Sequence, residues 1–157
     1  MPKLTLVVFS GDFDRAFVAF TIASRAAAEG WDVLMLFTFW GLGIVRDPNR
    51  SVPKKTEAEK VFDAALAKGA DDLRLSQMNM PELGTTMMKE QMSAKNMLPI
   101  REMMREAKEF GVRFLVCNIP MELMGIRKEE FVDEVDDICS VGRYLEEAKN
   151  ADLNLFI

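Results

Sequence analysis

Two short runs of apolar residues, with a helical segment between them, constrain the fold more than any other feature of this chain. Leu4–Phe9 and Val33–Phe39 are almost entirely apolar, as expected of parallel strands that are covered on both faces. Between them, phenylalanines recur at helical spacing from Phe13 to Phe20, and Gly30 marks the expected end of the helix. This order of strand, helix and strand predicts a βαβ unit with a parallel sheet.

The rest of the chain continues this alternation. A capping box formed by Thr56 and Glu59 predicts a helix that ends at Gly69. The apolar face of this helix contains Ala58, Val61, Phe62, Ala65 and Leu66. Another helix is expected after Pro99. Its apolar stripe contains Ile100, Met103, Met104, Ala107 and Phe110.

The remaining strands complete the predicted sheet. Apolar runs indicate strands at 112–117 and 152–157, whereas 72–75 is either a short strand or an extended connection. Residues 127–149 form either one long helix or, as the fold favours, a short helix, an extended piece near 135–138 and a second helix. We therefore predict an α/β protein with one three-layer domain over residues 1–157. Its sheet has about four or five mostly parallel strands, with helices on both faces.

The composition excludes several classes of chemistry. The chain has no histidine, which rules out Ser-His-Asp and Cys-His nucleophile pairs and removes the commonest transition-metal ligand. A net charge of −5 without a basic stripe argues against nucleic-acid binding. The start of the chain lacks the pattern of a signal peptide, and the longest apolar stretch, 33–45, is too short to span a bilayer. We expect a cytoplasmic protein with two free thiols, no cofactor, no metal and no membrane association.

Three loops are expected to leave the carboxyl ends of the strands, where sheets of this kind gather ligands and reactive groups. They are residues 10–12, 39–43 and 117–125. Cys117 stands where the third loop begins. Because free cysteines are among the most buried residues, Cys117 is either an inert core residue or a reactive thiol. Its position directly before a predicted helix favours the second reading, since the helix dipole and unpaired N–H groups stabilise a thiolate.

Other candidate motifs carry weaker signals. Cys139 follows two aspartates that disfavour a thiolate, and its spacing suits the apolar side of a helix or strand. Gly41 and Gly43 begin a glycine pattern, but Arg46 occupies the place of the third glycine of the dinucleotide fingerprint. A flavodoxin-type nucleotide or flavin domain is therefore only a third option. The acidic run at 128–137 is more typical of a solvated face than of a metal site.

Methionines are concentrated in one part of the chain. Ten of the 12 methionines lie between Met78 and Met124. Methionine commonly fills irregular gaps in a core, but Pro81 and Gly84 interrupt this cluster together with several polar residues. The segment 78–104 is therefore also a candidate for an adaptable, partly exposed surface that holds a partner or a second copy of the chain.

Five segments occur in an order that resembles a known family. They are FSGDFDRAFVAFTIA, LFTFWGL, LSQMNMPELGTTMM, VCNIPMELMGI and LNLFI. Together they resemble the DsrE/DsrF-like sulfur-relay family, and in particular its branch labelled peroxiredoxin-like. The resemblance covers nearly the whole chain and implies a compact three-layer α/β fold, frequent homo-oligomers and a cysteine that carries sulfur as a persulfide.

The resemblance also assigns positions. Cys117 matches the sulfur-carrying cysteine, whereas Cys139 matches no sulfur position, so the relay would use a single cysteine. The other matching positions, which are expected to line the site, are Ser10, Gly11, Asp12, Trp40, Gly41, Asn79, Gly84, Asn118 and Gly125.

The resemblance implies a sulfur carrier, or a sulfurtransferase acting by thiol–persulfide exchange. Cys117 would accept sulfane sulfur from a donor protein and pass it to the thiol of an acceptor protein. The alternative is a non-catalytic oligomeric interaction module that uses the Met-rich surface at 78–104.

Overall fold

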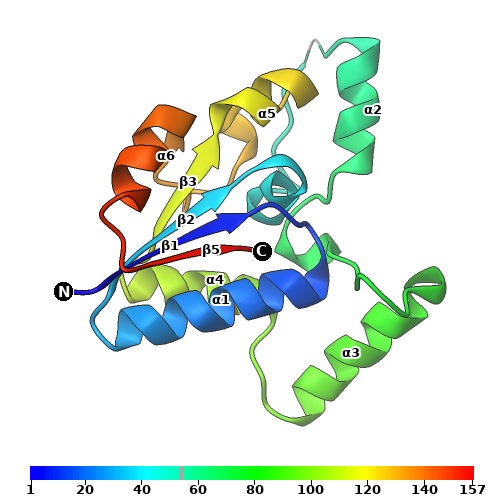
Figure 1. Ribbon diagram of the computed structural model, residues 1–157. Coiled ribbons are helices and arrows are strands. Elements are labelled where there is room, and N and C mark those ends of the chain that lie inside the picture. Colours follow the sequence, from blue (N-terminus) through cyan, green and yellow to red (C-terminus); the bar gives the residue numbers. More distant parts are fainter. Residues whose placement is uncertain (54) are drawn as a thin grey trace.

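A five-stranded parallel sheet forms the centre of the molecule (Figure 1). The computed structural model describes residues 1–53 and 55–157. The strands are β1 (Lys3–Val8), β2 (Asp32–Phe37), β3 (Arg113–Cys117), β4 (Asp137–Cys139) and β5 (Leu153–Phe156). They lie in the order β4-β3-β2-β1-β5, and every neighbouring pair is parallel. The predicted α/β fold is confirmed.

Helices cover both faces of this sheet. The helices α1 (Phe13–Ala28) and α4 (Ile100–Glu109) pack side by side on one face, and α6 (Val141–Ala148) lies on the other (Figure 1). At the carboxyl ends of the strands, β2 continues into a 3₁₀ helix (Phe39–Val45) and β3 continues into α5 (Asn118–Met124). The helices α2 (Glu57–Ala65) and α3 (Leu83–Ala94) extend away from the sheet (Figure 1).

The face under α1 and α4 holds the main core. Alternate strand residues point toward these helices, and three phenylalanines meet at its centre. The ring centroids of Phe20, Phe37 and Phe114 lie 5.5–6.2 Å apart, which is the range for favourable aromatic pairs. All three side chains are fully buried.

The opposite face buries much less. Its buried apolar residues, which we call the α6-face cluster, are Leu34, Leu36, Leu115, Cys117 and Cys139. Tyr144 of α6 packs against this cluster from above. Both cysteines of the chain therefore lie on the thinly covered face of the sheet.

Charged residues close the amino end of the sheet. The side chain of Arg113, at the start of β3, lies 2.9 Å from Glu147 of α6 and 3.1 Å from Asp32 at the start of β2. Lys3, at the start of β1, also pairs with Glu147. These contacts attach α6 to three strands.

Several predicted local details differ from the structure. The capping box of Thr56 and Glu59 is present, but α2 ends at Ala65 and not at Gly69. None of the α2 residues is buried: Val61 is 67% exposed, and only Leu66, just after the helix, is in the core. The predicted helical periodicity was correct, but the apolar residues Val61 and Phe62 stay exposed among the residues that the structure describes.

Two further expectations need correction, and one open alternative is decided. Phe110 is 47% exposed, because α4 ends before it. Residues 73–75 form an extended connection and not a strand. The strand expected at 33–39 runs from Asp32 to Phe37, since the chain turns into a 3₁₀ helix at Phe39, where φ is positive. In contrast, the short strand, helix and strand within 127–157 follow the favoured prediction.

In the part of the chain that the structure describes, no helix has both the length and the apolar character needed to cross a membrane.

Candidate functional site

The loops that leave β1 and β2 pack directly against each other. A Cβ atom added to Gly11 would lie 2.6 Å from the carbonyl oxygen of Trp40, and one added to Gly41 would overlap the carbonyl oxygen of Val8. The backbone N–H of Gly41 also donates to the carbonyl oxygen of Phe9. Glycine is required at both positions, because any side chain would push the two loops apart.

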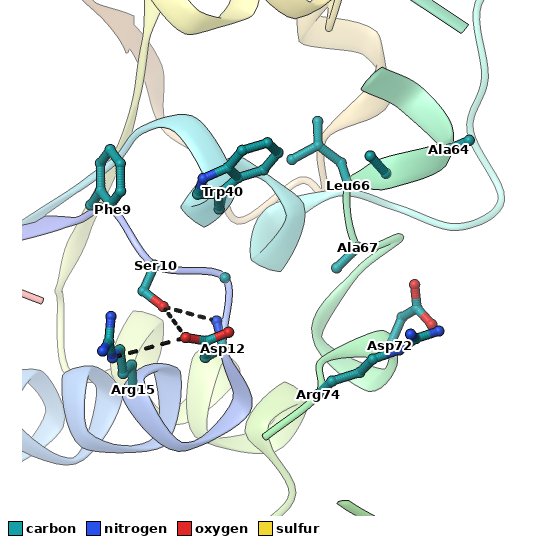
Figure 2. A pocket seen from close by; sticks show the side chains of 12 residues that line it. Phe9, Ser10, Asp12, Arg15, Trp40, Ala64, Leu66, Ala67, Asp72 and Arg74 are labelled. Atoms are coloured by element: carbon teal, nitrogen blue, oxygen red, sulfur yellow. Dashed lines mark hydrogen bonds and ion pairs between the residues drawn. The ribbon is translucent and has the colours of Figure 1, made fainter. Parts of the chain in front are cut away.

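A cavity of about 520 Å³ opens beside these loops (Figure 2). One wall is apolar and includes Phe9, Trp40 and Leu66, whereas the opposite side carries charged groups on Asp12 and Arg15. The other lining residues are Ser10, Gly11, Ala64, Ala65, Ala67, Asp72 and Arg74. Four of the predicted site residues therefore share one cavity at the carboxyl end of the sheet.

Ser10 fixes the polar side of this cavity. Its hydroxyl donates to Oδ2 of Asp12 at 3.0 Å and accepts the backbone N–H of Asp12 at 3.1 Å. Asp12 is the N-cap residue of α1, but its carboxylate makes no capping bond, and its Oδ2 lies 3.9 Å from Nε of Arg15. The carboxylate is thus held toward the cavity by Ser10 and not folded back on the helix (Figure 2).

Cys117 does not line this cavity. It is the last residue of β3 and the N-cap residue of α5, as the sequence predicts. Because side chains alternate along a strand, the side chain of Cys117 lies on the α6 face with Leu115, opposite to Val116. It is 5% exposed. The structure therefore does not bring Cys117 together with Ser10, Gly11, Asp12 and Trp40.

Asn79 and Gly84 lie at the start of α3 and shape the Met-rich segment. The side-chain oxygen of Asn79 accepts the hydroxyl of Thr85 at 3.2 Å, and this hydroxyl accepts the N–H of Leu75 at 3.0 Å. Any side chain at Gly84 would overlap the backbone of Met78. These two positions determine how the chain enters α3.

Gly125 ends α5 and lets it approach α2. Its φ of +69° lies in the left-handed region that favours glycine, and a Cβ at this position would overlap the side chain of Glu59. Gly125 therefore has a structural role at the helix–helix contact.

The sequence profile of the DsrE/DsrF/DrsH-like family matches residues 1–156. The chain belongs to this family.

Two relatives support the same assignment over nearly their whole lengths. The uncharacterized protein YrkE of Bacillus subtilis (strain 168) is 37% identical over 155 residues, which are 99% of this chain and 96% of YrkE. The sulfur carrier protein DsrE2 of Allochromatium vinosum is 30% identical over 156 residues, which are 99% of this chain and 98% of DsrE2.

Solved structures share the fold of this DsrE/DsrF-like chain. The ychN protein of E. coli has a TM-score of 0.55 at 12% identity, and the match covers 100% of both chains. The protein of unknown function MTH1491 of Methanobacterium thermoautotrophicum has a TM-score of 0.53 at 11% identity, with 99% of both chains covered. At these identities the likeness concerns the fold alone.

Asn118, next to Cys117, carries a polar atom without a partner. Its side-chain oxygen is buried and accepts no hydrogen bond from the residues that the structure describes. A buried acceptor left unpaired costs about 1–3 kcal/mol, and such groups call for an explanation other than stability. The unpaired oxygen belongs to the residue that follows the cysteine of this DsrE/DsrF-like protein.

Cys139 is the neighbour of Cys117 that sequence reasoning missed. The two residues are directly opposite each other in the parallel pairing of β3 and β4, and both side chains belong to the α6-face cluster. Burial raises the pKa of the Cys139 thiol, while Arg143 opposes this effect. The signal in the sequence was the extended piece predicted near 135–138, which ends next to this cysteine.

Proposed function

We propose that this protein is a sulfur carrier that holds sulfane sulfur as a persulfide on Cys117. The observation that carries the proposal is the position of Cys117 at the end of β3 in a chain of the DsrE/DsrF/DrsH-like family. The name of DsrE2, a sulfur carrier protein that is 30% identical over nearly the whole chain, supports the same role. The relay operates in a reducing cytoplasm, where cysteines return to thiols between cycles.

The proposed chemistry is thiol–persulfide exchange in two steps. The Cys117 thiolate attacks the outer sulfur of a donor persulfide, so that a new S–S bond forms and the donor leaves as a thiolate. An acceptor thiolate then attacks the outer sulfur of the Cys117 persulfide and releases the Cys117 thiolate. Neither step requires an external oxidant or reductant. The rate of each step depends on the fraction of the attacking thiol that is ionised and on access to the sulfur.

The helix that follows Cys117 presents apolar side chains to a protein partner. Cys117 is 5% exposed, whereas Ile119 and Leu123 of the adjoining α5 are 50% and 61% exposed. Apolar side chains in such a position are suited to contact with another protein. Donor and acceptor proteins would dock on this side of α5 and reach the thiol from there.

The test is the intact mass of the protein before and after incubation with glutathione persulfide, followed by peptide mapping. We expect the mass of one or more sulfur atoms to be added at Cys117 and removed by reductant. Cys117→Ser should not load, whereas Cys139→Ser should load as the wild type does. Full loading of Cys117→Ser would refute the proposal. Alkylation of native and denatured protein shows whether an unloaded thiol is inaccessible or merely unreactive.

A second candidate function is favoured by the Met-rich segment. Five exposed methionines, between 42% and 72% accessible, lie on and around α3. They are Met78, Met80, Met87, Met88 and Met97. In Figure 1, α3 stands away from the sheet, so these side chains are available to a second copy of the chain. The protein would then be an oligomeric interaction module that performs no sulfur transfer.

Sedimentation of charge variants tests this second function. Met87→Glu together with Met88→Glu should convert an oligomer to monomers, because buried carboxylates oppose an apolar interface. The control is Ser93→Glu, which adds charge at an exposed position on the opposite side of α3. A wild-type protein that is monomeric at all concentrations would refute the oligomeric module.

A further inference from the structure

Both cysteines of the chain lie opposite each other on neighbouring strands. Cys117 ends β3, Cys139 ends β4, and the two are partners in the parallel register. Neighbouring strands lie about 4.7–4.9 Å apart, whereas the Cα atoms of disulfide-bonded cysteines are usually about 4.4–6.8 Å apart. The backbone therefore already has a spacing that admits an S–S bond between these two residues.

The side chains are also on the same side. Both belong to the α6-face cluster, whose other members are leucines. No other cysteine exists in the 157 residues. Packing alone does not require cysteines in this cluster, because other apolar residues could fill the same space. The two cysteines instead form a pair of thiols in register.

The two thiols differ in their surroundings. Cys139 is fully buried, and its Sγ donates to the carbonyl oxygen of Ser140 at 3.2 Å. Cys117 is the more exposed of the two at 5%. Burial raises the pKa of Cys139, and the positive charge of Arg143 lowers it. The negative charges of Asp137 and Glu147 act in the same direction as burial. The buried Cys139 is therefore sheltered from an external donor, and Cys117 is its partner in the strand register.

We infer that Cys139 is a resolving thiol that discharges the Cys117 persulfide as sulfide when no acceptor is bound. This inference rests on the proposed function of Cys117. The Sγ of Cys139 attacks the Sγ of Cys117, the persulfide S–S bond breaks, and a Cys117–Cys139 disulfide forms. The electron pair of the broken bond leaves with the outer sulfur, which takes the proton of Cys139 and departs as hydrogen sulfide. The sulfane sulfur is reduced and the thiol pair is oxidised.

The pair is returned to its thiol form by an external dithiol reductant. Two exchange reactions transfer the disulfide to that reductant, which leaves both cysteines reduced. The short edge strand β4 carries Cys139 next to the N-cap Ser140 of α6. A partner that moves α6 therefore also moves Cys139 away from Cys117, which protects the persulfide while it is transferred.

The test follows the fate of the loaded persulfide in the absence of any acceptor. Wild type, Cys139→Ser and Cys139→Ala are loaded with glutathione persulfide, freed of excess donor and incubated without oxygen. We expect the wild type to release sulfide and to lose two hydrogen atoms relative to the reduced protein. Peptide mapping should find the Cys117–Cys139 crosslink. Both variants should retain sulfur about tenfold longer or more, because a positioned intramolecular thiol acts at high effective concentration.

The measurements separate the two proposals. If all three proteins load equally and lose sulfur at equal rates without a crosslink, Cys139 is not a resolving thiol and the sulfur carrier stands. If none loads, the loading step has failed and both proposals are overturned. Thermal unfolding of the two variants is the control for folding, and agreement between serine and alanine excludes an effect of the new hydroxyl group.

Discussion

The two faces of the sheet differ in depth, and both cysteines lie on the shallow one. Under α1 and α4, leucines, phenylalanines and methionines form a continuous core that extends to the carboxyl end of the strands. Under α6, five apolar residues are buried and one tyrosine covers them. One helix of eight residues cannot cover a face as two longer helices do.

The two faces contribute unequally to the stability of the fold. The deep face supplies most of the buried apolar area, which is the main source of folding free energy. The shallow face is held chiefly by polar contacts between α6 and the strands, such as those of Glu147 and Tyr144. The two cysteines lie under this helix, outside the main core.

The largest expected effect contrasts a leucine from each face. Leu6 of β1 is fully buried in the deep core, and Leu36 of β2 is 4% exposed in the α6-face cluster. We expect Leu6→Ala to lower the free energy of unfolding by about 4 kcal/mol, since a rigid core cannot close the cavity. Leu36→Ala should cost about 2 kcal/mol, because α6 can settle into the space.

Urea unfolding of both variants measures this contrast. Equal losses would mean that the α6 face is as rigid as the core, which would contradict a displaceable α6. Faster alkylation of the cysteines in Leu36→Ala, but not in Leu6→Ala, would strengthen the comparison.

The deep face was largely predictable from the sequence. Each of its strands is a short apolar run, and α1 and α4 have helical periodicity, so Phe20 and Met103 fall where the pattern places them. The last strand was identifiable from its apolar residues, although the periodic pattern does not indicate which strand it pairs with. That pairing depends on tertiary packing.

The shallow face and the site were less predictable. The neighbourhood of Cys117 and Cys139 depends on the register of β4, which is only three residues long and follows an acidic segment. Nor can periodicity alone distinguish an apolar face that is buried within the chain from one left exposed, as α2 and Val61 illustrate. The cavity beside Ser10 and Trp40 was anticipated in outline, because strand-exit loops of a parallel sheet meet at one end.

The second prediction concerns the ion pairs that hold α6. The hydrogen bonds from Arg113 and Lys3 lower the pKa of Glu147 to about 2, from an ordinary value of 4.5. Because the folded-state pKa is depressed, this stabilisation is present above pH 4.5 and is lost as the pH falls from 4.5 toward 2. Glu147→Gln should therefore cost about 1–2 kcal/mol at neutral pH, since solvent partly screens the pair. When the pH is lowered from 4.5 toward 2, the free energy of unfolding of this variant should fall less than that of the wild type.

Glu146→Gln is the matched control for this prediction. Glu146 is on the same helix, is 71% exposed at its side chain and pairs only with Lys149 among the described residues. An exposed pair of this kind contributes little, so the stability should hardly change. If Glu147→Gln also leaves the alkylation rate of Cys139 unchanged, the ion pairs do not control access to the thiols.

The smallest expected effect comes from the hydroxyl of Tyr144. This hydroxyl lies 3.1 Å from Oγ1 of Thr5, which is buried and also bonds to Asn154. Since Thr5 keeps Asn154 as a partner, Tyr144→Phe should lower the free energy of unfolding by only about 0.5–1 kcal/mol in urea titrations. The ring still covers the α6-face cluster, so the alkylation rates of both cysteines should stay at the wild-type value. Faster alkylation would mean that this hydrogen bond, and not the ring or the Glu147 pairs, keeps α6 over the thiols.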